Sequence, residues 1–330
     1  MGDAPDKRVS LLTLDRDAGN MLRGIAILLV MLGHTKIVRM GGAGGVALFL
    51  ILSGYGLNCS CESKGPKGYW LRRIKTVWLP YFFVGVLDVF LLKPRGAGPV
   101  LCTLAGLDLG MIADPTMWYI SYIFFWYLAY YVLARLFGGF PVQKRRIFIT
   151  AGLLLACAPC VLLSRLGFWH AGSLAKTYVL CFPLGVGMSA CREIRSPRSW
   201  RTALWAAVLL GCAAYLCLPL LGVRDLTYLT AMAMAGAAIA VLQLIPVGGV
   251  LGSALLRVGA YAYPLYLFEG LFLLRWNDWV TAMPAKWSAD LAFFAASAAA
   301  AVFYWSLYRA LEKRLSACYN RLKTDTEKPI

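Results

Sequence analysis

One apolar stretch carries a side chain suited to chemistry near each of its ends, Arg23 and His34. The two are eleven positions apart, which in an α-helix is about three turns, roughly 20° from full register, and ~16 Å of rise. Both side chains therefore share one face of the helix that we predict over about 21–38. A neutral imidazole can take a proton from a hydroxyl near pH 7, and a guanidinium can hold a phosphate or a developing negative charge.

Two observations favour a functional role for Arg23 and His34. The only other histidine is His170, which falls in a predicted outer loop, so His34 is the only histidine base expected within an apolar segment. Ionisable groups are costly in a bilayer and tend to face a bundle interior or a wet cavity, so two on one stripe favour a lined cavity. The alternative is that Arg23 is an interfacial arginine and His34 a hydrogen-bonding partner of another helix.

The loop that precedes the third apolar run is the second candidate region. It holds five cations interleaved with aromatic residues, namely Lys64, Lys67, Arg72, Arg73, Lys75, Tyr69, Trp70 and Trp78. Such cations can grip a phosphorylated nucleotide while the rings stack on its base. On charge alone, the favoured interpretation is that the loop sets the membrane topology and meets anionic lipid headgroups.

Small and acidic residues inside apolar runs form a third group. Residues 44–56 read GGVALFLILSGYG, whose glycines let another helix or a bound chain come close, and Ser53 could donate to a carbonyl oxygen. Asp88 and Glu269 are acids in apolar segments, where each could orient an imidazole, relay a proton or pair with an arginine. Pairing is the favoured interpretation for Asp88, whereas Glu269 stays open between a relay and a structural role.

The composition places these candidates in a membrane protein. Of the 330 residues, 60% are hydrophobic and only 15% are charged, and the mean hydropathy is +0.66, whereas roughly a quarter of the residues of a soluble domain are charged. At ~20 residues a span, the chain has room for about ten helices. We predict an all-α, polytopic membrane helix bundle, with one transmembrane domain over 21–308 between a cytoplasmic lead-in (1–20) and a polar cytoplasmic tail (309–330).

The apolar runs give the order of the expected spans. These cover about 21–38, 46–61, 79–93, 116–137, 147–164, 177–191, 202–221, 226–246, 258–274 and 290–308. An even number puts both termini on one side, and 24 of the 33 lysines and arginines fall on that side, which predicts cytoplasmic termini. This distribution accounts for the net charge of +17, so no nucleic-acid partner is expected. A short interfacial helix is expected around 9–14.

Four stretches, taken in order, resemble the acyltransferase-3 family of integral membrane acyltransferases. The run RGIAILLVMLGH, from Arg23 to His34, fits the family's first-helix signature of an Arg and a His with ten residues between them. Residues 45–55 fit its second-helix pattern, a Gly followed by an apolar, Phe-containing stretch and Leu-Ser-Gly-aromatic.

The other two stretches lie later in the chain. Residues 72–80 match a basic cluster followed by a Pro at the head of the third helix, and residues 259–267 match the late Gly-x-x-Ser-Tyr-x-x-Tyr-Leu pattern. Ala262 replaces the usual Ser of that pattern, and Glu269 stands where many members have His. The resemblance covers nearly the whole chain, and the departures bear on the donor loop and the acceptor more than on the class of protein.

The resemblance implies transfer of an acyl group, commonly acetyl from acetyl-CoA, from the cytoplasm to a hydroxyl of a cell-surface carbohydrate or its lipid-linked precursor. The CoA phosphates would meet the basic cluster, the pantetheine arm would pass Arg23, and His34 would act as general base or relay the acyl group. The site residues so expected are His34, Arg23 and Glu269 for catalysis, and Arg72, Arg73, Lys75, Ser53, Tyr69 and Trp70 for donor binding.

The remaining expectations concern partners and location. Acyl-CoA, a carbohydrate or lipid-linked glycan acceptor and membrane lipids are the expected partners, with no metal, in the cytoplasmic membrane of a bacterium. A carrier for an amino acid or small organic anion is the main alternative, because ten spans, polar residues near the midplane and a basic inner face would also suit one. A non-catalytic membrane module is a further alternative.

Overall fold

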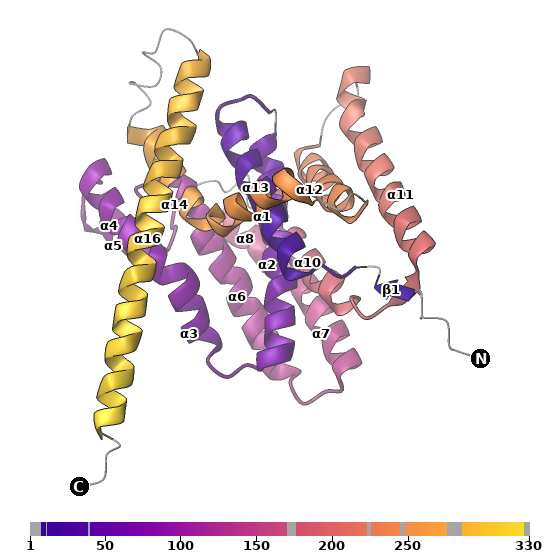
Figure 1. The fold of residues 1–330 in the computed structure, drawn as a ribbon, viewed down its shortest axis with the longest axis horizontal. Helices are drawn as coiled ribbons and strands as arrows, with labels where there is room; N and C mark the ends of the chain where they lie inside the picture. The colour runs from indigo at the N-terminus through magenta and orange to yellow at the C-terminus, as the bar shows by residue number, and fades with distance from the viewer. Residues whose placement is uncertain are drawn as a thin grey trace. The chain divides into compact units, whose positions relative to one another are not determined.

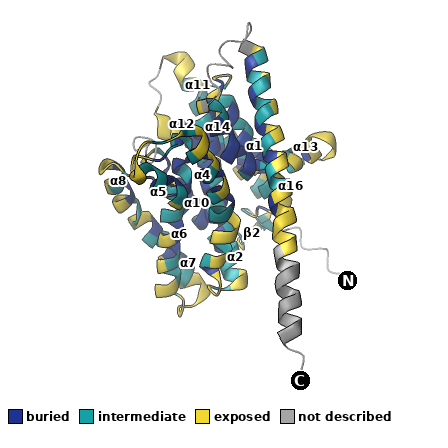
Figure 2. Cartoon of the chain, turned by 90° about the vertical axis from the view of Figure 1, so that its left-hand side faces the viewer, coloured by how far each residue is buried: buried dark blue, intermediate teal, exposed yellow. Residues whose placement is uncertain are grey.

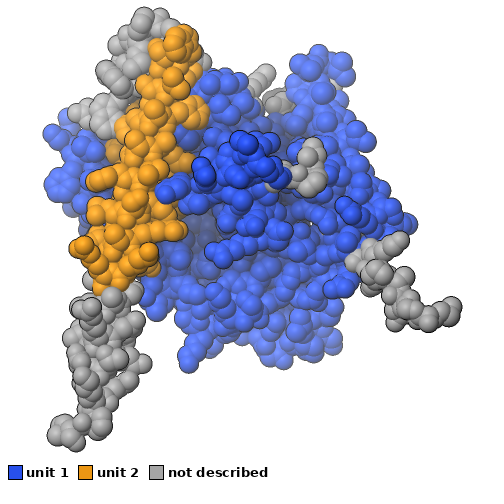
Figure 3. Space-filling model, in the orientation of Figure 1, with its two compact units in different colours: residues 1–262 blue, residues 263–330 orange. Residues whose placement is uncertain are grey.

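The computed structural model describes residues 8–10, 12–38, 40–169, 176–222, 226–244, 248–275 and 286–326. Nearly all of these residues are helical (Figure 1), which confirms the all-α prediction. His170, predicted to lie in an outer loop, falls outside the described residues. The chain divides into two compact units, Met1–Ala262 and Tyr263–Ile330 (Figure 3).

The first unit contains most of the helices. Their bounds are α1 (Arg16–His34), α2 (Gly41–Lys64), α3 (Tyr69–Arg73), α4 (Leu79–Leu92), α5 (Ala97–Ala105), α6 (Trp118–Leu136), α7 (Val142–Leu155), α8 (Cys157–Arg165), α10 (Cys181–Ala190), α11 (Arg198–Cys217), α12 (Thr227–Leu244) and α13 (Gly249–Ala260). Short 3₁₀ or π-helical pieces are η1 (Ile74–Trp78), η2 (Pro115–Met117), η3 (Lys176–Tyr178) and η4 (Leu218–Leu221). Helix α14 (Ala262–Arg275) begins where the first unit ends.

Among the described residues, seven helices are long and apolar enough to cross a membrane. They are Gly41–Lys64, Tyr69–Leu92, Pro115–Leu136, Val142–Arg165, Arg198–Leu221, Thr227–Leu244 and Trp287–Arg314. Each coincides with one of the ten predicted spans. The other three predicted spans correspond to α1, α10 and α14, which are helical but are not among the seven. The count of ten and the cytoplasmic termini therefore stay predictions.

Large apolar side chains are exposed around these helices. Helix α11 buries only Trp205, and residues such as Leu155, Leu210 and Phe303 are 70–77% exposed. Figure 2 shows the extent of the exposed residues on the helices. Apolar surface of this extent on transmembrane-length helices is what a lipid-facing surface requires, so the chain is an integral membrane protein.

Helix α2 is the centre of the first unit and packs against α1, α10 and α12 (Figure 1). The small residues predicted to let a neighbour approach do so at Gly44, where a methyl group would lie 2.7 Å from Met234 Cβ of α12, and at two places where a neighbouring backbone comes close. A methyl group on Gly54 would lie 2.3 Å from the Phe182 carbonyl oxygen, and one on Gly45 would lie 2.4 Å from that of Ala26. Gly56, in the same run, has no neighbour within 4 Å of such a methyl group. The glycine run therefore sets the α2 interfaces with α10 and α1.

Helix α1 is held on its other side by α13. A methyl group on Gly259 would lie 1.9 Å from the Asn20 carbonyl oxygen, and one on Gly24 would lie 2.6 Å from that of Leu255. The backbones of α1 and α13 therefore touch directly, which fixes where α1 presents its polar side chains.

Three expectations differ from the structure. The interfacial helix expected around 9–14 is wrong: strand β1 (Arg8–Ser10) pairs antiparallel with β2 (Arg195–Pro197) instead. The fifth predicted span consists of two helices, α7 and α8, which meet at Ala156. Helix α16 (Lys286–Thr326) continues well past the apolar run 290–308 into the polar tail.

In its described residues, the second unit consists of α16 and most of α14. Phe268 and Tyr304 pack with ring centroids 5.4 Å apart, which joins the two helices. Beyond the apolar run, the guanidinium of Arg309 lies over the Trp305 ring at 5.2 Å from its centroid, a cation–π contact at the point where the sequence turns polar.

Candidate active site

Helix α1 carries the two residues that the sequence singled out first. Asp15 caps the helix by accepting a hydrogen bond from the Ala18 N–H at 2.7 Å, and the helix then runs unbroken from Arg16 to His34. Arg23 and His34 are both exposed, whereas Leu22 and other neighbours are buried. The helical spacing of the pair is therefore confirmed. The catalytic role of each stays a prediction.

Arg23 is hydrogen-bonded within its own helix and lies near α6. Its Nη1 donates to Asn20 Oδ1 of α1 at 2.8 Å, and Tyr119 and Tyr127 of α6 are within electrostatic range of its guanidinium. These tyrosines are eight residues apart, or ~12 Å along α6. The hydroxyl of Tyr119 in turn lies 3.4 Å from Ser53 Oγ of α2. Two of the predicted site residues, Arg23 and Ser53, are thus linked through α6.

The basic loop joins the same group through Arg73. Its guanidinium lies over the Tyr127 ring, 5.3 Å from the centroid, and its Nε is buried without a hydrogen-bond partner among the described residues. We call the series Arg73, Tyr127, Arg23, Tyr119 and Ser53 the polar track. It leads from the end of the basic loop, along α6, to the middle of α2.

Arg72 acts within the loop itself. Its Nη1 donates to the Lys67 carbonyl at 2.6 Å and its Nη2 to the Gly65 carbonyl at 3.1 Å. Two hydrogen bonds of the guanidinium are therefore used to hold the turn between α2 and α3. Of the two adjacent arginines, Arg73 keeps more of its hydrogen-bonding capacity for a ligand.

The two aromatic residues of the loop have different exposures. Tyr69 is 3% exposed; its hydroxyl donates to the Tyr127 carbonyl at 2.8 Å, and its ring lies against those of Trp70 and Tyr131. Trp70 is half-buried and also contacts Tyr131. Because the faces of Tyr69 are covered by protein, Trp70 is the better placed of the two to stack on a nucleotide base.

Lys75 lies on an irregular turn. It is exposed and belongs to the π-helical segment η1, which joins α3 to α4. A π-helical turn widens the helix locally and occurs frequently at functional sites. The turn leaves the helical stretch from Tyr69 to Leu92 continuous.

The two acids in apolar segments are both buried. Glu269 lies in α14, in the second unit. Both carboxylate oxygens of Asp88 lack a hydrogen-bond partner within the described ranges, so the pairing with an arginine that the sequence favoured is absent there. No group of three or more His, Cys, Asp or Glu side chains in the described part of the chain could hold a metal ion.

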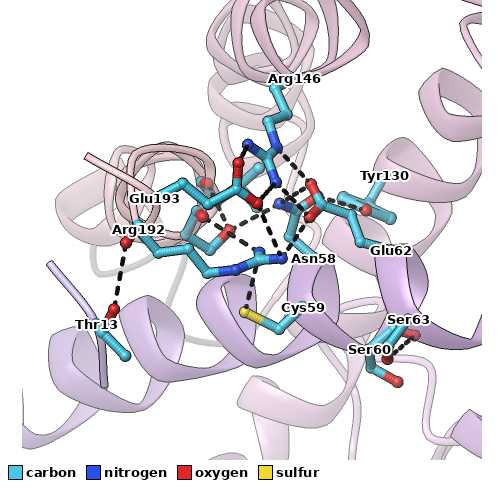
Figure 4. Close-up of polar contacts among 12 residues, drawn as sticks. Thr13, Asn58, Cys59, Ser60, Glu62, Ser63, Tyr130, Arg146, Arg192 and Glu193 are labelled. Atoms are coloured by element: carbon cyan, nitrogen blue, oxygen red, sulfur yellow. Dashed lines mark hydrogen bonds and ion pairs between the residues drawn. The ribbon is translucent and has the colours of Figure 1, made fainter. Parts of the chain in front are cut away.

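A second polar group lies at the end of α2, where the basic loop begins. Glu62 accepts hydrogen bonds from Arg146 Nε and Nη2, both at 2.9 Å, and from Arg192 Nη2 at 2.7 Å. Arg146 also donates to Glu193, at 2.7 and 2.9 Å. Figure 4 shows these four side chains meeting from α2, α7 and the segment after α10. We call this group the four-residue ion-pair network.

Uncharged groups complete this network. Asn58, 3% exposed, donates to Glu62 Oε1 at 3.1 Å and to Ser189 Oγ at 2.8 Å, and accepts from the Tyr130 hydroxyl at 2.7 Å (Figure 4). Every polar atom of the Asn58 side chain is thus engaged. Since buried ionic groups are stable only when their hydrogen bonds are satisfied, this arrangement indicates a structural joint.

The network has a defined pH dependence at Glu193, which lies between α10 and β2. Hydrogen bonds from Arg146, together with its charge, hold the pKa of the Glu193 carboxyl below its usual range. Because the folded-state pKa lies below the unfolded value of roughly 4.3, the stability contributed by this pairing is present above that pH. It is lost as the pH falls through the folded-state pKa.

Sequence reasoning missed the tyrosines of the polar track and the four-residue ion-pair network. The run WYISYIFFWYLAYY of α6 is conspicuous for its aromatic density, and this density is the signal that could have pointed to Tyr119 and Tyr127. No local signal pairs Glu62 with Arg146, because 84 residues separate them.

Comparison with known proteins gives one match. A family model described as an acyltransferase domain, acyltransferase-3, matches residues 17–309, nearly the whole chain. No curated protein and no solved structure matches the chain.

Proposed function

The chain belongs to the acyltransferase-3 family, and from that premise we propose that it moves an acyl group, acetyl above all, from cytoplasmic acyl-CoA to a hydroxyl of a cell-surface or lipid-linked carbohydrate. The family match and the helices of transmembrane length together identify a membrane acyltransferase. Neither finding favours the alternative of a carrier. The observation that supports the finer proposal is the polar track, because it links the basic loop to Arg23 and Ser53 through α6.

The donor end of the proposed site is the basic loop. Arg73 is held against the Tyr127 ring and has an unused buried N–H, so its guanidinium is oriented before a ligand arrives. Guanidinium groups bind phosphate through charge-assisted hydrogen bonds. Lys75 adds an exposed charge on the adjacent π-helical turn, Arg72 holds the loop, and Trp70 offers a ring to the adenine base.

The pantetheine arm would follow the polar track. Its two amide groups need hydrogen-bonding partners if they leave water. Arg23 is a donor, and the hydroxyls of Ser53 and Tyr119 can each donate or accept. The arm would then extend along α1 toward His34, ~16 Å beyond Arg23. A track of polar groups in an otherwise apolar bundle is what such a partly polar arm requires.

The transfer step would take place beside His34. The imidazole takes the proton of the acceptor hydroxyl, the hydroxyl oxygen bonds to the acyl carbon, the carbon–sulfur bond breaks, and CoA leaves as a thiolate that receives the proton. The exposure of His34 at the end of α1 suits an acceptor that arrives from outside the bundle. Glu269 is proposed as a carboxylate that relays a proton in the reaction.

The location follows from the same proposal. The basic loop must meet cytoplasmic acyl-CoA, so the loop and the termini face the cytoplasm and His34 lies toward the outer side. We place the protein in the cytoplasmic membrane of a bacterium, where a carbohydrate of the cell envelope is within reach of that side.

The first experiment is calorimetric titration of acetyl-CoA into the purified protein in nanodiscs, comparing wild type with Arg73→Ala and with Lys144→Ala. Lys144 is an exposed cation of α7 and serves as the matched control. We expect micromolar binding by wild type and Lys144→Ala, and at least tenfold weaker binding by Arg73→Ala.

Two results would count against the proposal. Absence of acetyl-CoA binding by a well-folded wild type would remove the acyl-CoA donor. Equal affinity of wild type and Arg73→Ala would leave the donor in place but remove the polar track as its binding site. A parallel titration with acetyl-CoA that lacks the 3′-phosphate would show how much this phosphate contributes to the affinity.

A further inference from the structure

A cavity of about 320 Å³ lies beside the four-residue ion-pair network. Its walls are the end of α2, the turn after it, the end of α6 and the start of α7. The polar side chains that line it are Asn58, Glu62, Tyr130, Arg135, Arg145 and Arg146, and Figure 4 shows four of these around the network. Its volume is at the lower end of the range for small-molecule sites.

The charges around the cavity do not balance. Arg146 and Arg192 pair with Glu62 and Glu193, so two positive and two negative charges compensate one another. Arg135 and Arg145 are left over: Arg135 is exposed and Arg145 half-buried, and neither guanidinium makes a hydrogen bond or an ion pair within the described residues. Two free guanidinium groups therefore face a cavity whose only carboxylate, Glu62, is already neutralised.

We propose that this cavity, which we call the arginine pocket, is a binding site for a phosphate-bearing anion, with Arg135 and Arg145 as the phosphate ligands. Guanidinium groups recognise phosphate with two parallel N–H···O bonds each. The four-residue ion-pair network supports the pocket, because it fixes Arg146 and Glu62 and so holds α2 and α7 at the spacing that leaves the cavity open. The pocket is distinct from the polar track and does not depend on the proposed reaction.

Two sources could supply the phosphate, the nucleotide end of a soluble cofactor or the headgroup of an anionic phospholipid. The test uses inorganic pyrophosphate as the soluble probe. Calorimetric titration in detergent compares wild type, the double variant Arg135→Gln, Arg145→Gln, and Lys144→Gln, a neighbouring cation that does not line the pocket. The same set is repeated with Arg73→Ala added, which weakens the basic loop and so separates the two anion sites.

We expect the double variant to bind pyrophosphate at least tenfold more weakly than wild type in both series, with Lys144→Gln unchanged. Native mass spectrometry of the same preparations is the lipid arm: an anionic phospholipid retained by wild type and lost by the double variant would support the pocket and assign it to a headgroup. Equal pyrophosphate affinity and equal lipid retention in all variants would overturn the proposal. The single variants Arg135→Gln and Arg145→Gln, compared with wild type by thermal unfolding, keep the test valid should the double variant misfold.

Discussion

At the scale of single residues, the structure separates two arginines that look equivalent in the sequence. The Nε of each is buried without a hydrogen-bond partner among the described residues. Arg72 uses Nη1 and Nη2 to donate to the Lys67 and Gly65 carbonyls, whereas the guanidinium of Arg73 lies over the Tyr127 ring. Their neighbours in space, not their residue type, decide which of them can serve a ligand. For His34, by contrast, the residue type alone makes it the candidate base.

Substitution of His34 tests its proposed chemistry. We expect His34→Ala to lower the rate of acyl transfer by about 10² to 10⁴-fold, the usual contribution of a general base, while acetyl-CoA affinity changes less than twofold. Transfer of labelled acetyl to an envelope fraction gives the rate, and calorimetry gives the affinity. A normally inserted His34→Ala protein that transfers acetyl at the wild-type rate would exclude His34 as the base.

At the scale of elements, α2 determines the arrangement of the first unit. It contacts α1, α10 and α12, its glycines allow the closest of these approaches, and its end carries Glu62, which two arginines join to α7 and the segment after α10. The van der Waals contacts of small residues hold membrane helices together, and a buried ion pair depends on both partners. The glycine contacts and the ion-pair network of α2 can therefore be tested separately.

The ion-pair joint is the subject of the second prediction. Arg146 is 6% exposed and bonded to two carboxylates, so Arg146→Ala leaves the largely buried Glu62 with Arg192 alone and the exposed Glu193 without this partner. We expect a loss of about 3 kcal/mol in the free energy of unfolding, measured as a lower thermal unfolding midpoint in detergent. Lys144→Ala, on the exposed side of α7, is the control, with an expected change within about 0.5 kcal/mol. Equal midpoints for both variants would contradict a structural role.

The glycine contact between α10 and α2 gives the third prediction. A methyl group on Gly185 would lie 2.0 Å from the Ile51 carbonyl oxygen, whereas one on Gly56 would meet nothing within 4 Å. We expect Gly185→Ala to destabilise the protein by about 1–3 kcal/mol and Gly56→Ala to be neutral or stabilising by up to about 1 kcal/mol. The thermal unfolding midpoints of the two variants test this prediction. An unchanged midpoint for Gly185→Ala would mean that α10 does not pack against α2 as described.

At the scale of the whole molecule, charge distribution bears on orientation. The excess of lysine and arginine on the side of the termini predicts that both ends face the cytoplasm. Each of the ten predicted spans has a helical counterpart, and an even number of crossings would return the chain to its starting side.

Reporter fusions test this orientation. We expect green fluorescent protein fused to the C-terminus to fluoresce and alkaline phosphatase fused at the same place to be inactive, because the phosphatase folds only outside the cytoplasm. Fusions after residue 38, in the first predicted outer turn, should behave in the opposite way. An active C-terminal phosphatase fusion would contradict the cytoplasmic C-terminus.

Much of the architecture is determined by the sequence alone. Apolar runs of span length must form helices in lipid, because every backbone polar group needs an internal hydrogen bond there. For that reason the positions of the seven long spans, the helical spacing of Arg23 and His34, and the close approach at Gly45 and Gly54 were all predictable. Motifs within single helices were equally readable, and they led to the correct family.

Contacts between distant segments were decided only by the tertiary structure. Strand β1 pairs with residues 185 to 189 positions further along the chain. Glu62 is bonded to Arg146 across 84 residues, and Tyr119 lies beside Ser53 across 66. No local pattern specifies such pairs, because hydropathy and helical period describe only a residue's immediate neighbours. The polar track and the arginine pocket exist because helix packing, set by the backbone contacts of α2 and α1, brings these side chains to one place.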